Sequence, residues 1–428
     1  MKKSITSILL AAIFLASCSS ASNTIFSKKT PHEKYEDKLE ESGLEKTPEG
    51  RQWLAASDAA LLRPQPISLP YRHIGNFPID KPRALGLDFT AKRGERLIFT
   101  LTKTAAVNFA LYAELYKKDV NGSTTLLYAA DTTITDFTYD VAEAGTYLLK
   151  LQPQLFHSGT YHLSVAVGPS LGFPIAGSKG SVGSFWGADR DGGKRSHEGI
   201  DIFAAKRTPA IAASDGYVTG VREGGIGGKT IWLRPENQNF TLYYAHLDEQ
   251  LVQEGQSVKK GDTIGLVGNT GNARYTPAHL HFGIYGYGGA VDPYPFVNRQ
   301  IKTAPAIGTK KLTTHLRLVK GYQSFDVLMK KSTILVAIAI TSKGYIAELP
   351  DGRLVQPSLA VVQPAVQPLK KINAVALTPV FTTPDVQAPS NGSIEPRTSI
   401  SVFGYFNGYA FVRSGDKEGW VPEKALEG

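Results

Sequence analysis

Short runs in which apolar and polar residues alternate are the feature that most limits what this chain can form. The clearest run is Tyr161, Leu163, Val165 and Val167, with polar or small residues between them. Successive side chains of a strand point to opposite faces, so a period of two indicates half-buried strands. The pattern recurs between residues 66 and 168. We therefore predict a mainly β fold that begins with an antiparallel β-sandwich of about 100 residues.

The length of the chain indicates more than one domain. At 428 residues it exceeds what one compact core normally holds. Residues 173–298 are rich in glycine and are expected to form a central domain of short strands joined by tight loops. Two later stretches, 305–362 and 370–428, also have the pattern of short strands. We expect turns there at Asp351-Gly352 and Asn407-Gly408.

The first residues have the features of a secretory signal. Two lysines precede a short apolar run from Ile8 to Ala16, which is too short to span a membrane. The run ends in Leu15-Ala16-Ser17-Cys18, which resembles the bacterial lipobox, where the signal is cut before a cysteine that then carries lipid. We predict a signal peptide at 1–17 and a lipid anchor at Cys18. The alternative is ordinary cleavage that removes Cys18 with the signal.

Cys18 is the only cysteine, which restricts the chemistry of the exported chain. An internal disulfide, a cysteine nucleophile and a cysteine metal ligand are all excluded. The formal charge is +9, and it falls to +7 when Lys2 and Lys3 leave with the signal. This excess favours approach to an anionic polymer or membrane surface, and we expect no nucleic-acid partner.

Residues 18–65 are predicted as a tether that contains one short helix. From 27 to 52 the sequence is crowded with charged residues, and its apolar residues are too scattered for a core. Thr47-Pro48 is a helix-start signal, because threonine caps and proline suits the first helical position. We expect that helix to end near Leu62.

The segment His197-Glu198-Gly199-Ile200-Asp201 places an imidazole and a carboxylate four residues apart. Both groups bind zinc. The opening His-Glu invites comparison with the helical H-E-x-x-H motif, but the last position is aspartate, and Gly199 and Ile200 disfavour a helix. We expect a loop that carries His197 into a strand that carries Asp201, with Gly199 free to adopt the turn. Glu198 is not assigned as a base.

A second segment, His279-Leu280-His281-Phe282, places two histidines on one face of a strand, roughly 7 Å apart. Such a pair alone is more often structural than metal-binding. The remaining histidines have no second ligand type at useful spacing, and we predict them at the surface or at strand edges. They are His32, His73, His157, His162 and His315.

Together these segments resemble the LytM and lysostaphin-type zinc endopeptidases, whose pattern is H-x-G-x-D, a later Y-x-H and then H-L-H-F. The Y-x-H match is Tyr244-Ala245-His246, and the other two are the segments above. The resemblance covers about 125 of the 428 residues. It implies a compact antiparallel β fold with a zinc groove across the sheet, and an activity that cuts peptide cross-links in peptidoglycan.

By position, the resemblance implies that His197, Asp201 and His281 bind Zn²⁺ and that His246 and His279 are catalytic. It does not divide proton transfer and oxyanion stabilisation between the last two. Arg207 is a departure, because relatives commonly have glycine there. Tyr243 and Tyr244 are candidates for the groove wall, although aromatic residues in strands more often serve packing.

Two alternatives stay open. One is an inactive relative that binds peptidoglycan or activates another hydrolase such as an amidase. The other is a wall-binding scaffold, because the two C-terminal stretches resemble bacterial SH3-like modules, especially at Gly419-Trp420-Val421-Pro422. Ser19 after Cys18 resembles the sorting pattern of outer-membrane lipoproteins, which predicts the periplasmic face of that membrane. The placement of the N-terminal sandwich before the peptidase suggests two roles, which are to bind a partner or to cover part of the groove and inhibit the enzyme.

Overall fold

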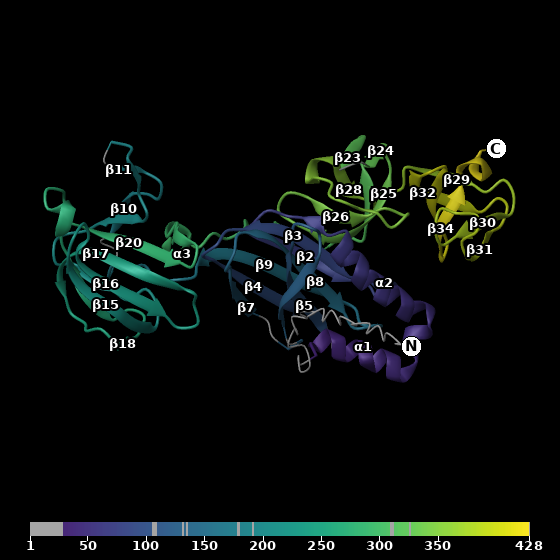
Figure 1. The fold of residues 1–428 in the computed structure, drawn as a ribbon. Helices are drawn as coiled ribbons and strands as arrows, with labels where there is room; N and C mark the ends of the chain where they lie inside the picture. Colours follow the sequence, from purple (N-terminus) through teal and green to yellow (C-terminus); the bar gives the residue numbers. More distant parts are fainter. Residues whose placement is uncertain are drawn as a thin grey trace, which may run out of the picture.

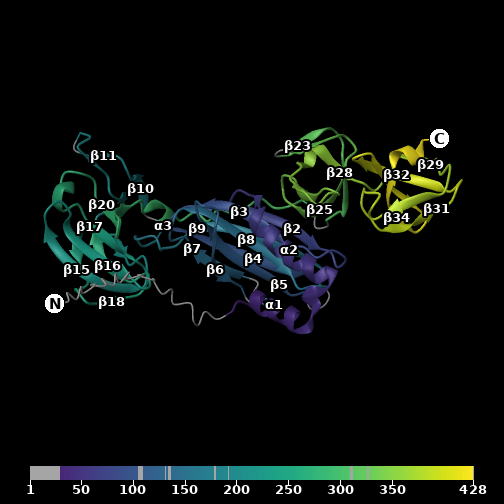
Figure 2. The same cartoon turned by 45° about the vertical axis from the view of Figure 1, so that its right-hand side comes forward.

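The computed structural model describes residues 29–104, 109–130, 132–133, 136–177, 180–190, 192–308, 312–324 and 327–427. Its secondary structure is mainly β, as the alternating pattern predicts. The signal peptide and Cys18 lie outside the described residues. Among the described residues, no helix is long and apolar enough to cross a membrane. The strands form a central sandwich, with the sheet of residues 181–291 at one end and the C-terminal sheet at the other (Figures 1 and 2).

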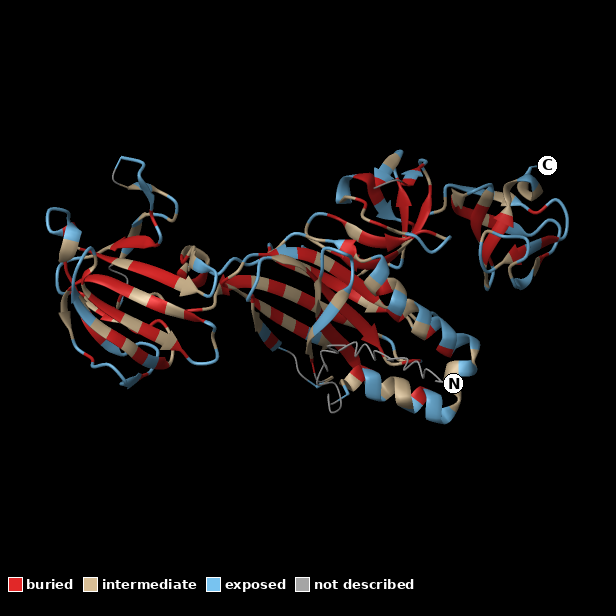
Figure 3. Cartoon of the chain, in the orientation of Figure 1, coloured by how far each residue is buried: buried red, intermediate tan, exposed pale blue. Residues whose placement is uncertain are grey.

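The sandwich consists of two sheets that pack on a shared core. The first runs in the order β1 (Gln65–Pro66), β3 (Leu85–Ala91), β8 (Gly145–Pro153), β5 (Leu111–Lys118) and β6 (Thr124–Ala129). The second runs in the order β27 (Leu354–Val355), β26 (Tyr345–Glu348), β25 (Ile334–Ile340), β2 (Tyr71–Phe77), β9 (Gly159–Pro169), β4 (Glu95–Thr104) and β7 (Asp136–Asp140). Leu87 of the first sheet and Leu163 of the second are both buried in this core, which confirms the predicted sandwich. Burial alternates along many of the strands (Figure 3).

The second sheet joins segments that are far apart in the sequence. Strands β2 and β25 pair, with Ile74 opposite Ile340, and Ile338 and Ile346 are buried in the sandwich core. Strands β22 (His315–Leu318) and β28 (Val362–Pro364) extend this group beside β25, and β23 (Tyr322–Ser324) pairs with β24 (Val327–Met329). The stretch 305–362 thus joins the N-terminal sheet through β25, but Leu316, Leu335 and most of its other buried residues pack in a core of their own, and the separate module stays a prediction.

The C-terminal sheet runs in the order β29 (Lys370–Asn373), β32 (Ser399–Phe406), β33 (Tyr409–Ser414), β34 (Lys417–Pro422), β30 (Thr378–Phe381) and β31 (Ser390–Ile394). Within the described residues no pairing between β29 and β31 closes it, so the SH3-like barrels stay a prediction. The two expected turns are confirmed. Gly352 (φ 87°) and Gly408 (φ 80°) adopt the left-handed backbone that favours glycine.

The prediction of a solvated tether is wrong for residues 31–42. They form helix α1 (Pro31–Ser42), which Thr30 and Glu33 cap reciprocally, and α2 (Pro48–Leu62) follows with Thr47 as its cap, as predicted. Both helices pack on the sandwich. Trp53 is fully buried there, and its Nε1–H donates to the carbonyl of Pro153 at 2.7 Å. The scattered apolar residues of α1 are sufficient because the sheet supplies the rest of this core.

Two of the histidines that we predicted at the surface are buried. His32 stacks on Trp53 with ring centroids 4.9 Å apart, and its Nε2 lies 2.8 Å from the Gln152 side-chain oxygen. His73 is completely buried beside Tyr71, with 3.0 Å between its Nδ1 and the tyrosine hydroxyl. Both are structural. Among the described residues, the one group of three or more His, Cys, Asp and Glu that could hold a metal lies elsewhere.

The central sheet is antiparallel and spans residues 181–291. Its order is β10 (Ser181–Ser184), β13 (Ile200–Phe203), β20 (His279–Gly286), β17 (Phe240–Gln250), β16 (Gly228–Pro235), β15 (Gly216–Gly224) and β18 (Ser257–Val258). Beside this path lie β14 (Pro209–Ile211), β19 (Thr263–Val267), β21 (Gly289–Val291), the β11–β12 ribbon (Asp189–Arg190, Arg195–Ser196) and α3 (Tyr294–Val297). One face of the sheet packs on its own apolar core, and the other carries the histidines.

Candidate metal centre

The pairing of β13 with β20 brings the two predicted motifs together. Asp201 lies opposite His281 in the ladder. Because side chains alternate, both point to one face, while their neighbours Ile202 and Leu280 are fully buried on the other. His197 reaches the same face from the loop before β13. The predicted change from loop to strand in this motif is confirmed.

Gly199 is required for a different reason from the one we expected. It is not among the glycines of positive φ, so its backbone does not need the conformational freedom of glycine. A Cβ at this position would lie 2.6 Å from His281 Cε1 and 2.7 Å from the carbonyl oxygen of Phe282. The chain passes so close to His281 that only glycine fits.

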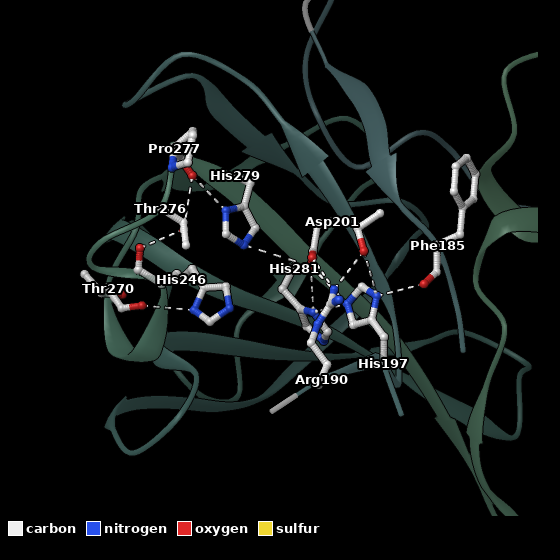
Figure 4. Close-up of polar contacts among 12 residues, drawn as sticks. Phe185, Arg190, His197, Asp201, His246, Thr270, Thr276, Pro277, His279 and His281 are labelled. Carbon is white, nitrogen blue, oxygen red and sulfur yellow. Dashed lines mark hydrogen bonds and ion pairs between the residues drawn. The ribbon is translucent and has the colours of Figure 1, made fainter. Parts of the chain in front are cut away.

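Three donor atoms converge at this point (Figure 4). His197 Nε2, Asp201 Oδ1 and His281 Nδ1 are each 3.0 Å from the other two. His197 and Asp201 are buried, at 3% and 8% exposure. His197 Nδ1 lies 2.9 Å from the Phe185 carbonyl, to which it donates, so its Nε2 lone pair faces the cluster. Two imidazoles and one carboxylate suit a metal that keeps a further coordination position open.

The protonation states also suit metal binding. Burial alone would raise the pKa of Asp201, but the adjoining imidazoles of His197 and His281 favour its ionised form and hold the pKa well below its usual range. Burial lowers the pKa of His281, against the opposing effect of Asp201. At neutral pH the carboxylate is therefore ionised and the His281 imidazole is neutral, which is the state that a metal ligand needs.

His246 and His279 lie beside the three donors without joining them. The His246 ring centroid is 5.1 Å from that of His279 and 5.9 Å from that of His281. Each donates its Nδ1–H to a backbone carbonyl at 2.9 Å, His246 to Thr270 and His279 to Pro277. His279 Nε2 is 3.9 Å from Asp201 Oδ1. Burial, and then the charges of the two other histidines, lower the pKa of His246 to about 4, so it is neutral at pH 7.

One residue of the site was not predicted. Arg190, on the β11–β12 ribbon, places Nη2 at 2.7 Å from Asp201 Oδ2 and at 2.8 Å from Ser184 Oγ. The two oxygens of Asp201 thus have separate partners, with Oδ1 toward the histidines and Oδ2 toward the guanidinium. An arginine in a glycine-flanked loop has no characteristic spacing to a ligand. Only the strand pairing, which sets Ser184 opposite Asp201, reveals its position.

The five predicted residues line one cavity of about 730 Å³. Its described lining residues all lie between 184 and 285 and include Tyr243. The sandwich contributes none of them, so the described structure gives no support to a groove covered by the N-terminal domain. Tyr244 is instead fully buried, and its hydroxyl accepts a hydrogen bond from the Ala213 amide at 2.9 Å, which is the packing role.

The departure at Arg207 is accommodated locally. Its φ of 67° is left-handed, the conformation that glycine favours. Its guanidinium pairs with Asp248 at 2.7 Å and with Glu249 at 2.8 Å. The loop therefore keeps a backbone suited to glycine while it carries a charge.

These features are those of a metal-dependent hydrolase site. Residues 195–293 match Peptidase family M23, and the chain therefore carries a peptidase domain of that family.

Three relatives show how far the similarity extends. The chain is 38% identical over 127 residues to an L-Ala--D-Glu endopeptidase of Bacillus subtilis, which covers 27% of this chain and 39% of that protein. It is 40% identical over 88 residues to the peptidoglycan DD-endopeptidase ShyC of Vibrio cholerae, covering 21% and 20%. It is 36% identical over 104 residues to a lipoprotein NlpD/LppB homolog of Pseudomonas aeruginosa, covering 24% and 34%. The chain thus covers less than half of each relative.

Proposed function

We propose that this protein is a zinc-dependent endopeptidase that hydrolyses peptide cross-links of bacterial peptidoglycan. The observation that carries the proposal is the convergence of His197 Nε2, Asp201 Oδ1 and His281 Nδ1 in a cavity that also holds His246 and His279. The M23 domain and the relatives named for peptidoglycan support the substrate class.

In this proposal His197, Asp201 and His281 hold the ion, and His246 and His279 move protons. A bound zinc ion supplies an activated water and polarises the peptide carbonyl. The Nδ1–H of each catalytic histidine is fixed by a backbone carbonyl, so its Nε2 faces the cavity as a base. One imidazole accepts a proton from the attacking water, and after protonation it donates at the leaving amine. The other, when it is protonated at Nε2, donates a hydrogen bond that stabilises negative charge on the carbonyl oxygen.

The test uses the chain that starts after Cys18. Bound zinc is measured by atomic emission, and purified peptidoglycan is digested and its fragments are read by mass spectrometry. We expect zinc-dependent release of newly cut peptides, and the masses identify the bond. His281→Ala should lose both zinc and hydrolysis. The matched control is His157→Ala, which removes a half-buried histidine of the sandwich.

A second candidate is an inactive lipoprotein that binds the wall or activates an amidase. The similarity to a relative named as a lipoprotein, the NlpD/LppB homolog, supports the lipoprotein part of this candidate. Intact cross-links in the presence of bound zinc would support this candidate and reject the peptidase.

The location and the flanking segments complete the proposal. We infer that Cys18 carries a lipid that anchors the chain at the periplasmic face of the outer membrane, in keeping with the lipoprotein relative. Residues 173–298 act as the peptidase unit, and residues 370–428 position it on the wall as an SH3-like module. Replacement of Cys18 by alanine should move the chain from the membrane fraction to the soluble fraction. Unchanged fractionation would reject the anchor.

A further inference from the structure

Three aromatic side chains lie on the same face of the central sheet as the metal centre. They are Trp232 on β16, Tyr243 on β17 and Tyr285 on β20. Their chain neighbours Ile231, Leu242 and Ile284 are fully buried in the core on the other face. Because side chains alternate along a strand, the aromatic residues point outward, as His281 does.

The three rings contact one another at an angle, with 40° between the planes of Trp232 and Tyr243, 49° between Trp232 and Tyr285, and 82° between the two tyrosines. The Trp232 ring centroid is 4.4 Å from that of Tyr243 and 5.5 Å from that of Tyr285, and the two tyrosine centroids are 5.9 Å apart. The Tyr243 centroid is also 5.9 Å from that of His281. We call Trp232, Tyr243 and Tyr285 the aromatic shelf. It begins directly beside the metal centre.

Glycines flank the shelf on both sides of the ladder. Trp232 lies opposite Tyr243, Gly220 lies opposite Trp232, and Gly283 lies opposite Tyr243. A Cβ at Gly283 would lie 2.9 Å from the Tyr285 ring. Gly220, Trp232, Tyr243 and Gly283 thus form one row across four strands, with no bulky aliphatic side chain among them. All three rings remain partly exposed.

The shelf has the chemistry of a saccharide site. A pyranose ring presents a flat face of C–H groups that packs on aromatic rings, and hydroxyls around its edge. The four residues of the row Gly220, Trp232, Tyr243 and Gly283 are uncharged, and the Arg222 side chain borders them, with Nε 3.5 Å from where a Gly220 Cβ would lie. Burial raises the pKa of Tyr243, and burial followed by the charge of Glu198 raises that of Tyr285 to about 12, so both hydroxyls remain protonated donors.

We propose that the aromatic shelf binds a sugar ring of the glycan strand while the adjacent metal centre acts on the peptide attached to it. This inference rests on the proposed function, because the glycan strand is the part of that polymer with this chemistry. It assigns a role to Tyr243 and Tyr285, and to a tryptophan that no motif indicates.

The test uses the chain that starts after Cys18 and the β-1,4-linked tetramer of N-acetylglucosamine, which contains no peptide. Binding is measured by isothermal titration, and saturation transfer from the aromatic protons reports contact with the sugar. We expect Tyr285→Ala to weaken binding by about tenfold, and Tyr285→Phe, which keeps the ring, to retain it. Tyr287→Ala is the matched control, because Tyr287 is fully exposed in the turn after β20.

A second variant keeps the test valid if Tyr285→Ala disturbs the sheet. A Cβ at Gly220 has ordinary contacts at 3.5 Å, so Gly220→Leu should cover the shelf and leave its rings in place. Thermal unfolding verifies the fold of each variant. No binding by the parent chain, or equal binding by Tyr285→Ala and Gly220→Leu, would overturn the shelf.

The two proposals fail separately. If the chain binds the tetramer through the shelf but leaves cross-links intact, the saccharide site is supported and the peptidase is rejected. If the chain cuts cross-links but does not bind the tetramer, the peptidase is supported and the saccharide site is rejected.

Discussion

Gly199→Ala should damage the metal centre without removing any ligand. Its Cβ would lie 2.6 Å from His281 Cε1 and 2.7 Å from the Phe282 carbonyl oxygen, whereas ordinary van der Waals contact begins at 3.4 Å. The shortfall exceeds half an ångström. The added Cβ would clash with the Phe282 backbone oxygen and with the His281 ring, which Asp201 and His197 already hold. Neither group can move away without moving the His281 donor atom.

The expected magnitudes follow from that displacement. Overpacking in a well-packed core costs about 1–3 kcal/mol of stability. A change in the residues that orient a metal ligand typically costs about 10–100-fold in metal affinity. We therefore expect Gly199→Ala to bind zinc at least about tenfold more weakly in a chelator competition, with a smaller loss in the free energy of unfolding.

The control is Gly288→Ala, because Gly288 lies in the turn after β20, and a Cβ there meets nothing within 4 Å. It should bind zinc as the parent does. If Gly199→Ala also binds zinc as the parent does, the close approach of this glycine does not constrain His281, and the argument fails.

Four further predictions follow from the structure. His246→Ala should retain zinc but lose about 10²–10⁴-fold in hydrolysis, measured by fragment release, because its ring is outside the ligand set. Trp53→Ala should cost about 3–5 kcal/mol in urea unfolding, since Trp53 is fully buried and bonded to Pro153. Burial, with a smaller effect of His162, lowers the pKa of His73 from 6.5 to about 3. The contribution of His73 to the free energy of unfolding is therefore fully present above pH 6.5 and is lost as the pH falls toward 3. Because His73→Phe removes the titrating group, this variant should lose about 3 kcal/mol less stability between pH 7 and pH 4 than the parent does. A chain that ends at residue 304 should unfold at a lower temperature than one that ends at residue 368, because it loses β25 from the sandwich; equal melting temperatures would contradict the pairing.

The local parts of the fold could be predicted from the sequence. The period of two in 161–167 marks β9, and Thr47-Pro48 marks the start of α2. The two histidines of His279–Phe282 lie on one strand face, as their spacing requires. Each of these signals lies within a few residues and depends only on the alternation of a strand or the capping of a helix.

What the sequence did not reveal depends on contacts between distant residues. Helix α1 is stable because the sandwich completes its core, and the spacing of the apolar residues between 31 and 42 does not reveal that contact. His73 looks like an exposed histidine until the aromatic neighbours Tyr71 and Tyr161 are placed around it. Arg190 joins the metal centre only through the register of β10 with β13. Propensity and spacing carry no information about such partners.

The order of segments along this chain is not their order in space. The peptidase sheet is inserted between β9 and β22, and those strands belong to one sheet with β2 and β25. Both connections leave the sandwich side by side, since the Val167 and Lys302 backbones pair and the Leu171 amide donates to the Phe296 carbonyl at 2.8 Å. The inserted domain also packs tightly on the sandwich at Gly94, where a Cβ would lie 2.2 Å from the Phe296 ring. Two adjacent connections and a packed contact restrict rotation of the peptidase sheet more than one flexible linker would. These contacts therefore also restrict how the cavity, which is lined from 184 to 285, can move relative to the sandwich.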